Sequence, residues 1–319
     1  MTTKFIKATK AKKILKQVQD DTITHDSIGG VRGDTLSTSN DGIFEPYKSN
    51  QADAFWTSGI GRKFMGIPFD IRVIGDFKRL SGVEKLLSCF RDKQTDLPFF
   101  DAGSGQGYMS FALESAGFKV VGVELSQSMF EQSLALSHEY NLKSSTEFYF
   151  GDLASMENIP QIQNQIFAGA ICEGVILHMT PEVLDKSLKN ISDRLIRGAP
   201  FVVSMICESI LKPLSPPRQK TSSVIHLSDL TELNSYEGYK SHLGQVQLFH
   251  SVLPKTEAMT PKVYIHPHDL VYHLLAKNGF EITETTDNYV TQAQLNVSDR
   301  WRGGPSNYSI YHTVLAYKT

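Results

Sequence analysis

The sequence has few cysteines, no long hydrophobic run and no excess of charge of one sign, and each absence excludes a class of protein. Cys89, Cys172 and Cys207 are the three cysteines among 319 residues, and this odd, widely spaced set predicts reduced thiols rather than a disulfide framework. Apolar runs such as 166–172 are far shorter than the roughly 18 to 20 residues that cross a bilayer. These features predict a soluble, cytoplasmic protein.

The charge is nearly balanced, with 32 Lys and Arg against 34 Asp and Glu. Such a balance is not typical of a protein that binds nucleic acid over its whole surface. Residues 1–19 are an exception, because they are rich in lysine, hold no acid and carry apolar residues between the lysines. They predict a basic amphipathic helix, which is either a solvated terminal helix, a transit peptide or a segment that contacts an anionic membrane or nucleic acid.

Residues 21–70 show no sustained period but hold scattered aromatic residues, including Trp56. Long segments of this kind are usually functional covers or disordered, and the aromatic content favours a cover. A helix is predicted over 75–91, where apolar residues recur at helical spacing. Together with the basic helix, these segments define a predicted N-terminal region, 1–94, that covers the substrate or cofactor.

From residue 97 onward, apolar runs alternate with helical patterns. Five runs are expected to be strands, at 97–100, 119–125, 147–150, 166–172 and 201–207. Helices are expected between them, at 108–115, 128–139 and 181–197. Strands that alternate with helices in this way predict a parallel sheet with helices on both faces.

The alternation breaks after the fifth predicted strand. Residues 208–262 are polar, contain proline and are predicted to form an insertion that acts as a lid. A helix over 267–278 and two strands, 281–289 and 311–318, are expected to close the chain. The predicted fold class is therefore α/β, with a doubly wound, mostly parallel seven-stranded sheet spanning 95–319.

A glycine-rich turn follows the first predicted strand and reads Asp-Ala-Gly-Ser-Gly-Gln-Gly from Asp101 to Gly107. Glycines in such a turn let backbone N–H groups approach a ligand at the carboxyl ends of the strands. The nicotinamide fingerprint would need a glycine at position 108, where Tyr108 stands. The motif is therefore acid-x-Gly-x-Gly-x-Gly, and a nicotinamide oxidoreductase is disfavoured.

This motif, and the acidic residues that end the later strands, resemble the class I S-adenosylmethionine-dependent methyltransferases of small-molecule type, over residues 95–205. The resemblance implies the Rossmann-like methyltransferase fold, the cofactor S-adenosyl-L-methionine and the product S-adenosyl-L-homocysteine. It implies that the glycine loop holds the methionine part, Glu124 the ribose hydroxyls and Asp152 the adenine amine. The implied cofactor-binding residues are Asp101, Gly103, Gly105, Gly107, Glu124, Leu125, Asp152, Leu153 and Glu173.

Glu173 and His178 are the candidate catalytic residues, because Glu173 ends the fourth predicted strand and His178 follows it by five positions. The ordinary pKa of histidine suits proton acceptance near neutral pH, although His178 can equally pack beneath the next helix. Methyl transfer is an in-line displacement, so orientation of the nucleophile can suffice without a dedicated base. The candidate substrate-binding residues are Tyr108, Trp56 and Trp301, the last flanked by Arg300 and Arg302.

His266 and His268 form an isolated pair without nearby cysteine or acidic ligands, so no metal site is predicted. Residues 172–175 read Cys-Glu-Gly-Val, not the Asn/Asp-Pro-Pro-aromatic element associated in the resembled family with nucleic-acid bases. Together with the balanced charge, this favours a small molecule over DNA or RNA as the methyl acceptor, and we expect the methyl group to go to a nitrogen or oxygen atom. An RNA or protein methyltransferase and a non-catalytic cofactor-binding subunit are the alternatives. The identity of the methyl acceptor and the oligomeric state do not follow from the sequence.

Overall fold

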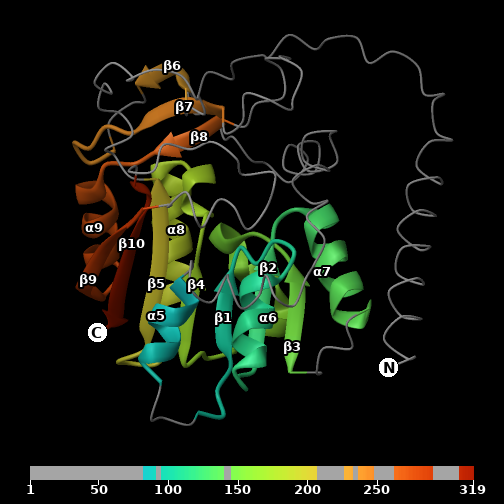
Figure 1. The fold of residues 1–319 in the computed structure, drawn as a ribbon. Coiled ribbons are helices and arrows are strands. Elements are labelled where there is room, and N and C mark those ends of the chain that lie inside the picture. Colours follow the sequence, from blue (N-terminus) through green and yellow to red (C-terminus); the bar gives the residue numbers. More distant parts are fainter. Residues whose placement is uncertain are drawn as a thin grey trace, which may run out of the picture. The chain divides into compact units, whose positions relative to one another are not determined.

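A computed structural model describes residues 82–90, 95–139, 145–206, 226–232, 236–247, 262–289 and 309–319. Its main sheet contains β1 (Phe99–Ala102), β2 (Val120–Glu124), β3 (Thr146–Phe150), β4 (Gly169–Cys172), β5 (Pro200–Ile206), β9 (Phe280–Tyr289) and β10 (Ser309–Lys318). Figure 1 shows these seven strands side by side, in the order β3-β2-β1-β4-β5-β10-β9. The first five are parallel and β10 is antiparallel to both of its neighbours. The predicted fold class is confirmed.

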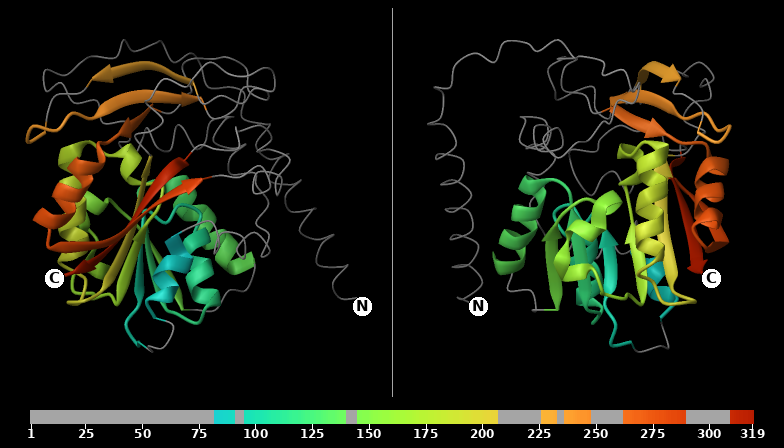
Figure 2. Two further views of the ribbon diagram at one scale, coloured as in Figure 1. Left: turned by 60° about the vertical axis from the view of Figure 1, so that its left-hand side comes forward. Right: turned by 180° about the vertical axis from the view of Figure 1, so that it is seen from behind.

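Helices cover both faces of this sheet. They are α5 (Gly82–Ser88), α6 (Tyr108–Ser115), α7 (Gln127–Glu139), α8 (Pro181–Ser192) and α9 (His268–Lys277), with 3-10 turns η1 (Leu153–Asn158), η2 (Pro160–Ile162) and η3 (Ile176–His178). Successive residues of a strand point to opposite faces. Phe99 therefore joins the hydrophobic cluster of α5 and α6, whereas Phe100 joins that of α8 and α9. Figure 2 shows the two helix layers on either side of the sheet.

Some predicted boundaries are wrong: the strand expected over 166–172 begins at Gly169, and the helix expected over 75–91 ends at Ser88. The largest difference is at the end of a later helix. The helix expected over 181–197 begins at Pro181, where the Thr180 hydroxyl accepts a hydrogen bond from the N–H of Val183, but it ends at Ser192. Residues 194–196 leave the helix because their backbone pairs with Phe167, whose N–H donates to the carbonyl of Arg194. These hydrogen bonds to Phe167 satisfy backbone groups that a further helical turn would otherwise pair.

The insertion contains a second sheet that the sequence pattern does not predict. It consists of β6 (His226–Glu232), β7 (His242–Gln247) and β8 (Lys262–Ile265), paired antiparallel in that order. A register shift between Ser228 and Thr231 interrupts the ladder between β6 and β7. Such an irregularity disturbs the alternation of sides on which strand prediction depends.

The predicted basic helix (1–19) and the aromatic segment (21–70) lie outside the described residues. Helix α5 is the described part of the helix expected over 75–91, and its Val83 and Leu86 are fully buried against the main sheet. Within the ranges that the structure describes, no helix combines the length and apolar character that a membrane span needs.

Candidate functional site

Most of the predicted site residues lie at one edge of the main sheet. Asp101 belongs to β1 and Glu124 ends β2, while Asp152 and Glu173 follow β3 and β4 closely. Because β1 to β4 are parallel neighbours, their carboxyl ends share this edge, and open α/β sheets bind ligands there. The fold therefore brings together four acidic residues that span 73 positions, from 101 to 173 inclusive.

The glycine loop after β1 has no room for side chains. Gly103, Gly105 and Gly107 have φ values of 81°, 55° and 87°, in the left-handed region that favours glycine. A Cβ at Gly103 would lie 2.5 Å from Cγ2 of Val175, and one at Gly107 would lie 2.7 Å from Cζ of Phe148. At these glycine positions the loop has backbone atoms alone, and backbone is the surface that a helix N-terminus offers to a ligand.

The Glu124 carboxylate holds this loop in place. Its Oε2 accepts a hydrogen bond of 2.7 Å from the N–H of Gly105, and its Oε1 accepts one of 2.8 Å from the N–H of Ser126. The N–H groups of Gly103 and Ser104 donate to the carbonyl of Val123 at 2.9 and 3.0 Å. The backbone of Leu125 also donates to this carboxylate, so three of its roughly four lone-pair sites are used by the chain.

Both acids beneath the loop have raised pKa values. Desolvation raises the pKa of Glu124 to about 7, against the opposing effect of the N–H donors. Desolvation also raises the pKa of Asp101 to about 6, although the Ser110 hydroxyl donates to its Oδ2 at 2.6 Å. Asp101 is only 2% exposed, so its carboxyl anchors α6 under the loop. A positively charged ligand would favour the ionised form of both groups.

The predicted adenine element is a capped turn. Asp152 precedes η1 and its Oδ1 accepts a hydrogen bond of 2.8 Å from the N–H of Ala154. Leu153 is 4% exposed and points into the core, while its carbonyl accepts from the side chain of Asn190 on α8. Leu125 is half-buried directly after β2. The side chain of Leu153 therefore belongs to the core.

The turn after β4 holds the two candidate catalytic residues. Gly174, with φ 67°, donates its N–H to the Ser204 hydroxyl of β5 at 3.0 Å. Glu173 is half-buried beside it, and His178 ends η3. Burial lowers the pKa of His178 to about 3, so its ring is neutral at physiological pH. Tyr108, a candidate substrate residue, begins α6 and is half-buried in the cluster on the α6 face.

His266 links the insertion sheet to this turn, a role that the sequence analysis missed. Its Nε2 lies 3.2 Å from the carbonyl oxygen of Ile176 and 3.1 Å from that of Met179. Carbonyls only accept, so Nε2 carries the proton and Nδ1 accepts from the Ser241 hydroxyl at 2.9 Å. Burial lowers the pKa of His266 to about 4, which keeps the ring neutral. The described residues contain no cluster of three or more metal-ligating side chains.

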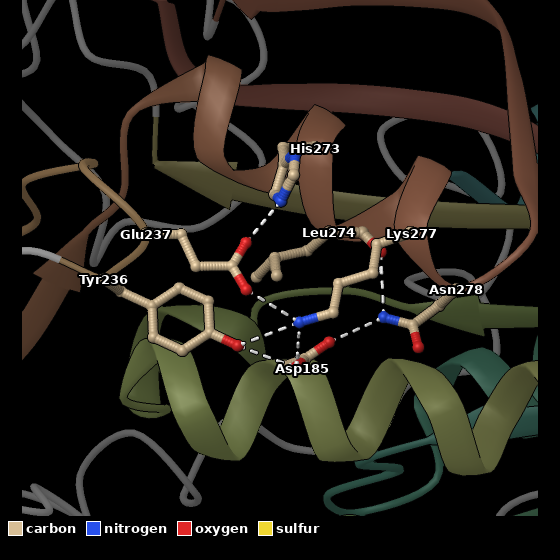
Figure 3. Close-up of polar contacts among 7 residues, drawn as sticks. All are labelled: Asp185, Tyr236, Glu237, His273, Leu274, Lys277 and Asn278. Carbon is tan, nitrogen blue, oxygen red and sulfur yellow. Dashed lines mark hydrogen bonds and ion pairs between the residues drawn. The ribbon is translucent and has the colours of Figure 1, made fainter.

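A second attachment joins the insertion to α8 and α9 (Figure 3). The Tyr236 hydroxyl donates to Oδ2 of Asp185 at 2.7 Å, and Nδ2 of Asn278 donates to Oδ1 at 2.8 Å. Lys277 pairs with Asp185 and with Glu237, both at 3.0 Å. The turn at 236–239 is thereby fixed to the helix layer. Trp56 and Trp301, with Arg300 and Arg302, lie outside the described residues.

Comparison with known proteins identifies one matching family and many solved structures with a similar fold. Residues 78–195 match a family described as "Methyltransferase domain". No curated protein sequence matches the chain. Magnesium protoporphyrin IX methyltransferase (ChlM) from Synechocystis PCC 6803, solved with bound S-adenosylmethionine, is similar with a TM-score of 0.53 and 15% identity, over 88% of this chain and 100% of that chain.

Two further solved structures are similar at lower scores. The CcbJ methyltransferase from Streptomyces caelestis has a TM-score of 0.48 and 14% identity, over 74% of this chain and 88% of its own. The glycopeptide N-methyltransferase MtfA, complexed with S-adenosylmethionine, has a TM-score of 0.48 and 15% identity, over 74% of this chain and 93% of its own. At such identities the likeness to ChlM shows a shared fold.

Proposed function

We propose that the chain, whose residues 78–195 match a methyltransferase domain, is an S-adenosylmethionine-dependent enzyme that methylates a nitrogen or oxygen atom of a small molecule. The observation that carries the proposal is the insertion sheet fixed beside the turn after β4. His266 ties β8 to η3, and Tyr236 ties the 236–239 turn to α8. A cover attached at two points suits an enclosed small acceptor better than a polymer.

The cofactor is proposed to lie across the glycine loop. Glu124 would accept from the ribose hydroxyls, alongside the N–H groups of Gly105 and Ser126 that already bind its two oxygens. Asp152 would accept from the adenine amine, with Leu125 and the backbone of Leu153 beside it. The raised pKa values of Asp101 and Glu124 fit a ligand that brings a positive charge to this edge.

Glu173 and His178 are proposed to face the methyl acceptor. The bound cofactor supplies an electrophilic methyl group. The chain must hold the nucleophile in line with it, and orientation of this kind can contribute about 7 to 11 kcal/mol. A neutral His178 ring can accept a hydrogen bond from the acceptor and orient it. With a pKa of about 3, that ring holds a transferred proton poorly.

Methyl transfer from labelled S-adenosylmethionine tests the proposal. The purified protein is incubated with an unfractionated small-molecule extract, with total RNA and with a protein extract in separate reactions. We expect label in the small-molecule reaction, and about a 100-fold slower transfer for His178→Ala, because the acceptor is no longer held in line with the methyl group. His138→Ala on the exposed face of α7 is the control and keeps the wild-type rate.

Other distributions of label decide between the alternatives. Label in RNA or in protein would replace the small acceptor by a polymer. Cofactor binding without transfer in any reaction would indicate a non-catalytic cofactor-binding subunit.

A further inference from the structure

A tyrosine, a histidine and an aspartate form a hydrogen-bonded chain outside the site described above. The Tyr272 hydroxyl of α9 lies 2.6 Å from Nε2 of His312 on β10. Nδ1 of His312 lies 2.7 Å from Oδ1 of Asp287 on β9. The three residues therefore come from three elements that meet at the antiparallel side of the main sheet (Figure 1).

The chemistry of the groups fixes the direction of the hydrogen bond to Asp287, and for a neutral ring it also fixes the direction of the hydrogen bond to Tyr272. The Asp287 carboxylate can only accept, so Nδ1 of His312 carries a proton and donates it. A neutral ring then has an unprotonated Nε2, which accepts from the Tyr272 hydroxyl. This is the arrangement in which a carboxylate holds the tautomer of a histidine that takes a proton from a hydroxyl.

The ring of His312 is rigidly held. Its side chain is 7% exposed, and the His268 ring stacks on it with the centroids 4.0 Å apart and the planes 18° from parallel. The Asp287 side chain at the other end is 42% exposed. Protein encloses the ring, while the carboxylate keeps contact with solvent, through which a proton can leave.

The chain lies at the same edge of the main sheet as the turn that carries His178. His312 pairs with Met205 of β5, and Cys172 at the end of β4 pairs with Val203. His312 is thus at the same sheet edge, two strand spacings or about 10 Å from β4. A chain of contacts also connects the two regions, since His266 binds the carbonyls that flank His178 and His268, two positions later, stacks on His312.

We infer that Tyr272, His312 and Asp287 form a proton relay that deprotonates the methyl acceptor; the inference rests on the proposed function. A nitrogen or oxygen of the acceptor gives its proton to Oη of Tyr272, whose own hydroxyl proton moves to Nε2 of His312. The electron pair left on the acceptor forms the bond to the methyl carbon, and the carbon–sulfur bond breaks with its pair kept by sulfur. The proton rests on His312 beside Asp287 and then passes to solvent.

In this relay Tyr272 contacts the acceptor. His312 and Asp287 do not contact the acceptor and act on it through Tyr272. The relay supplies what His178 lacks, because a ring whose pKa burial lowers to about 3 does not retain a proton. A purely structural network would instead only attach α9 to β9 and β10. The two roles differ in what the loss of the Tyr272 hydroxyl changes.

The first test is nitrogen NMR of histidine-labelled protein, which needs no acceptor. We expect His312 as the Nδ1–H tautomer, and a shift of its Nε2 resonance in Tyr272→Phe with Nδ1–H retained. Tyr317→Phe is the matched control, because Tyr317 lies on the same strand but at its opposite end, bonded to Cys89. An Nε2–H tautomer, or an Nε2 resonance that Tyr272→Phe does not move, would overturn the relay.

The second test is label transfer to the small-molecule extract. Tyr272→Phe should lower the maximal rate by about 100-fold or more, with the KM for S-adenosylmethionine unchanged, as expected for loss of a general base. Tyr317→Phe should keep the wild-type rate. A Tyr272→Phe protein with an unchanged maximal rate refutes the relay even if the extract is methylated. A wild-type protein that transfers no label refutes the proposed function, and the relay is refuted with it.

Discussion

The polar side chains at β1 and β2 are held differently from those at β10, although both groups lie at the same edge of the main sheet. At β1 and β2, Glu124 accepts from the backbone of Gly105 and Asp101 accepts from Ser110, over separations of 19 and 9 positions. At β10, His312 joins Tyr272 and Asp287, over separations of 40 and 25. In the first half of the edge, at β1 and β2, carboxylates accept from a backbone N–H and from a hydroxyl that are close in the sequence, whereas the second half, at β10, is an assembly of distant side chains.

This difference has a functional meaning. Backbone N–H groups stay the same when side chains are substituted, so a loop built from them suits a ligand that never changes, as a cofactor does. Side chains from several elements can be exchanged one at a time, which suits recognition of a particular acceptor. The first half is therefore expected to tolerate few substitutions, and the second to control rate and specificity.

The largest effect is expected from Gly103→Ala. The new Cβ meets Val175 at 2.5 Å in a left-handed backbone, so we expect a loss of about 2 to 4 kcal/mol in the free energy of unfolding, from strain and overpacking together. Urea unfolding measures it. Gly117→Ala is the control, because Gly117 also has positive φ but nothing within 4 Å of its Cβ; it should lose about 1 to 2 kcal/mol. Equal losses would show that the loop has room for a side chain.

The second prediction concerns Glu124→Gln, which leaves the side chain almost isosteric but removes its charge. A hydrogen bond to a charged group contributes about 1.5 to 3 kcal/mol, so the Kd for S-adenosylmethionine should rise by about 10- to 100-fold. Glu139→Gln, at the exposed end of α7, should leave the Kd unchanged. Calorimetric titration gives both values, and an unaltered Kd in Glu124→Gln would remove Glu124 from the cofactor site.

The pH dependence of stability, compared between wild type and Glu124→Gln, reports on the Glu124 carboxyl group. Burial raises the pKa of Glu124 from 4.5 to about 7, so the folded state binds this proton more tightly than the unfolded state. The contribution of Glu124 to stability is therefore present at acidic pH and is lost as pH rises toward 7 and above. The free energy of unfolding of Glu124→Gln should increase relative to wild type between pH 5 and about pH 8.

His178 and His266 act in the opposite sense, because burial lowers their pKa values to about 3 and about 4. Both proteins contain them, so their effect cancels in the difference between the two unfolding curves. A difference that does not change with pH would show that Glu124 is not desolvated.

The smallest effect is expected where the insertion meets the helix layer. Asp185→Ala removes contacts with Tyr236, Lys277 and Asn278, and should lower the free energy of unfolding by about 1 kcal/mol while speeding amide exchange at 236–247. Asp193→Ala on the same helix breaks one exposed pair with Lys189, and about 0.5 kcal/mol or less should be lost. If amide exchange at 236–247 is equal in the two variants, the network in Figure 3 does not hold the insertion.

The sequence predicts the parallel half of the molecule well, because each element there is bounded by local signals. The glycine loop, Pro181 at the start of α8 and the acids at the strand ends are all of this kind. The strands β6 to β8 are not predicted, since a register shift interrupts their pairing. The hydrogen-bonding roles of His266 and His312 are also not predicted, because their partners lie between 25 and 90 positions away and no sequence spacing connects them.

Calorimetric titration of S-adenosylmethionine into Asp152→Ala tests the central claim most directly. Asp152 caps η1 through the N–H of Ala154, and we propose that its carboxylate also accepts from the adenine amine. The account predicts one-to-one binding to the wild-type protein and at least about a tenfold weaker Kd for the variant. A wild-type protein that releases no heat at any cofactor concentration, or a variant that binds as tightly as wild type, would contradict it.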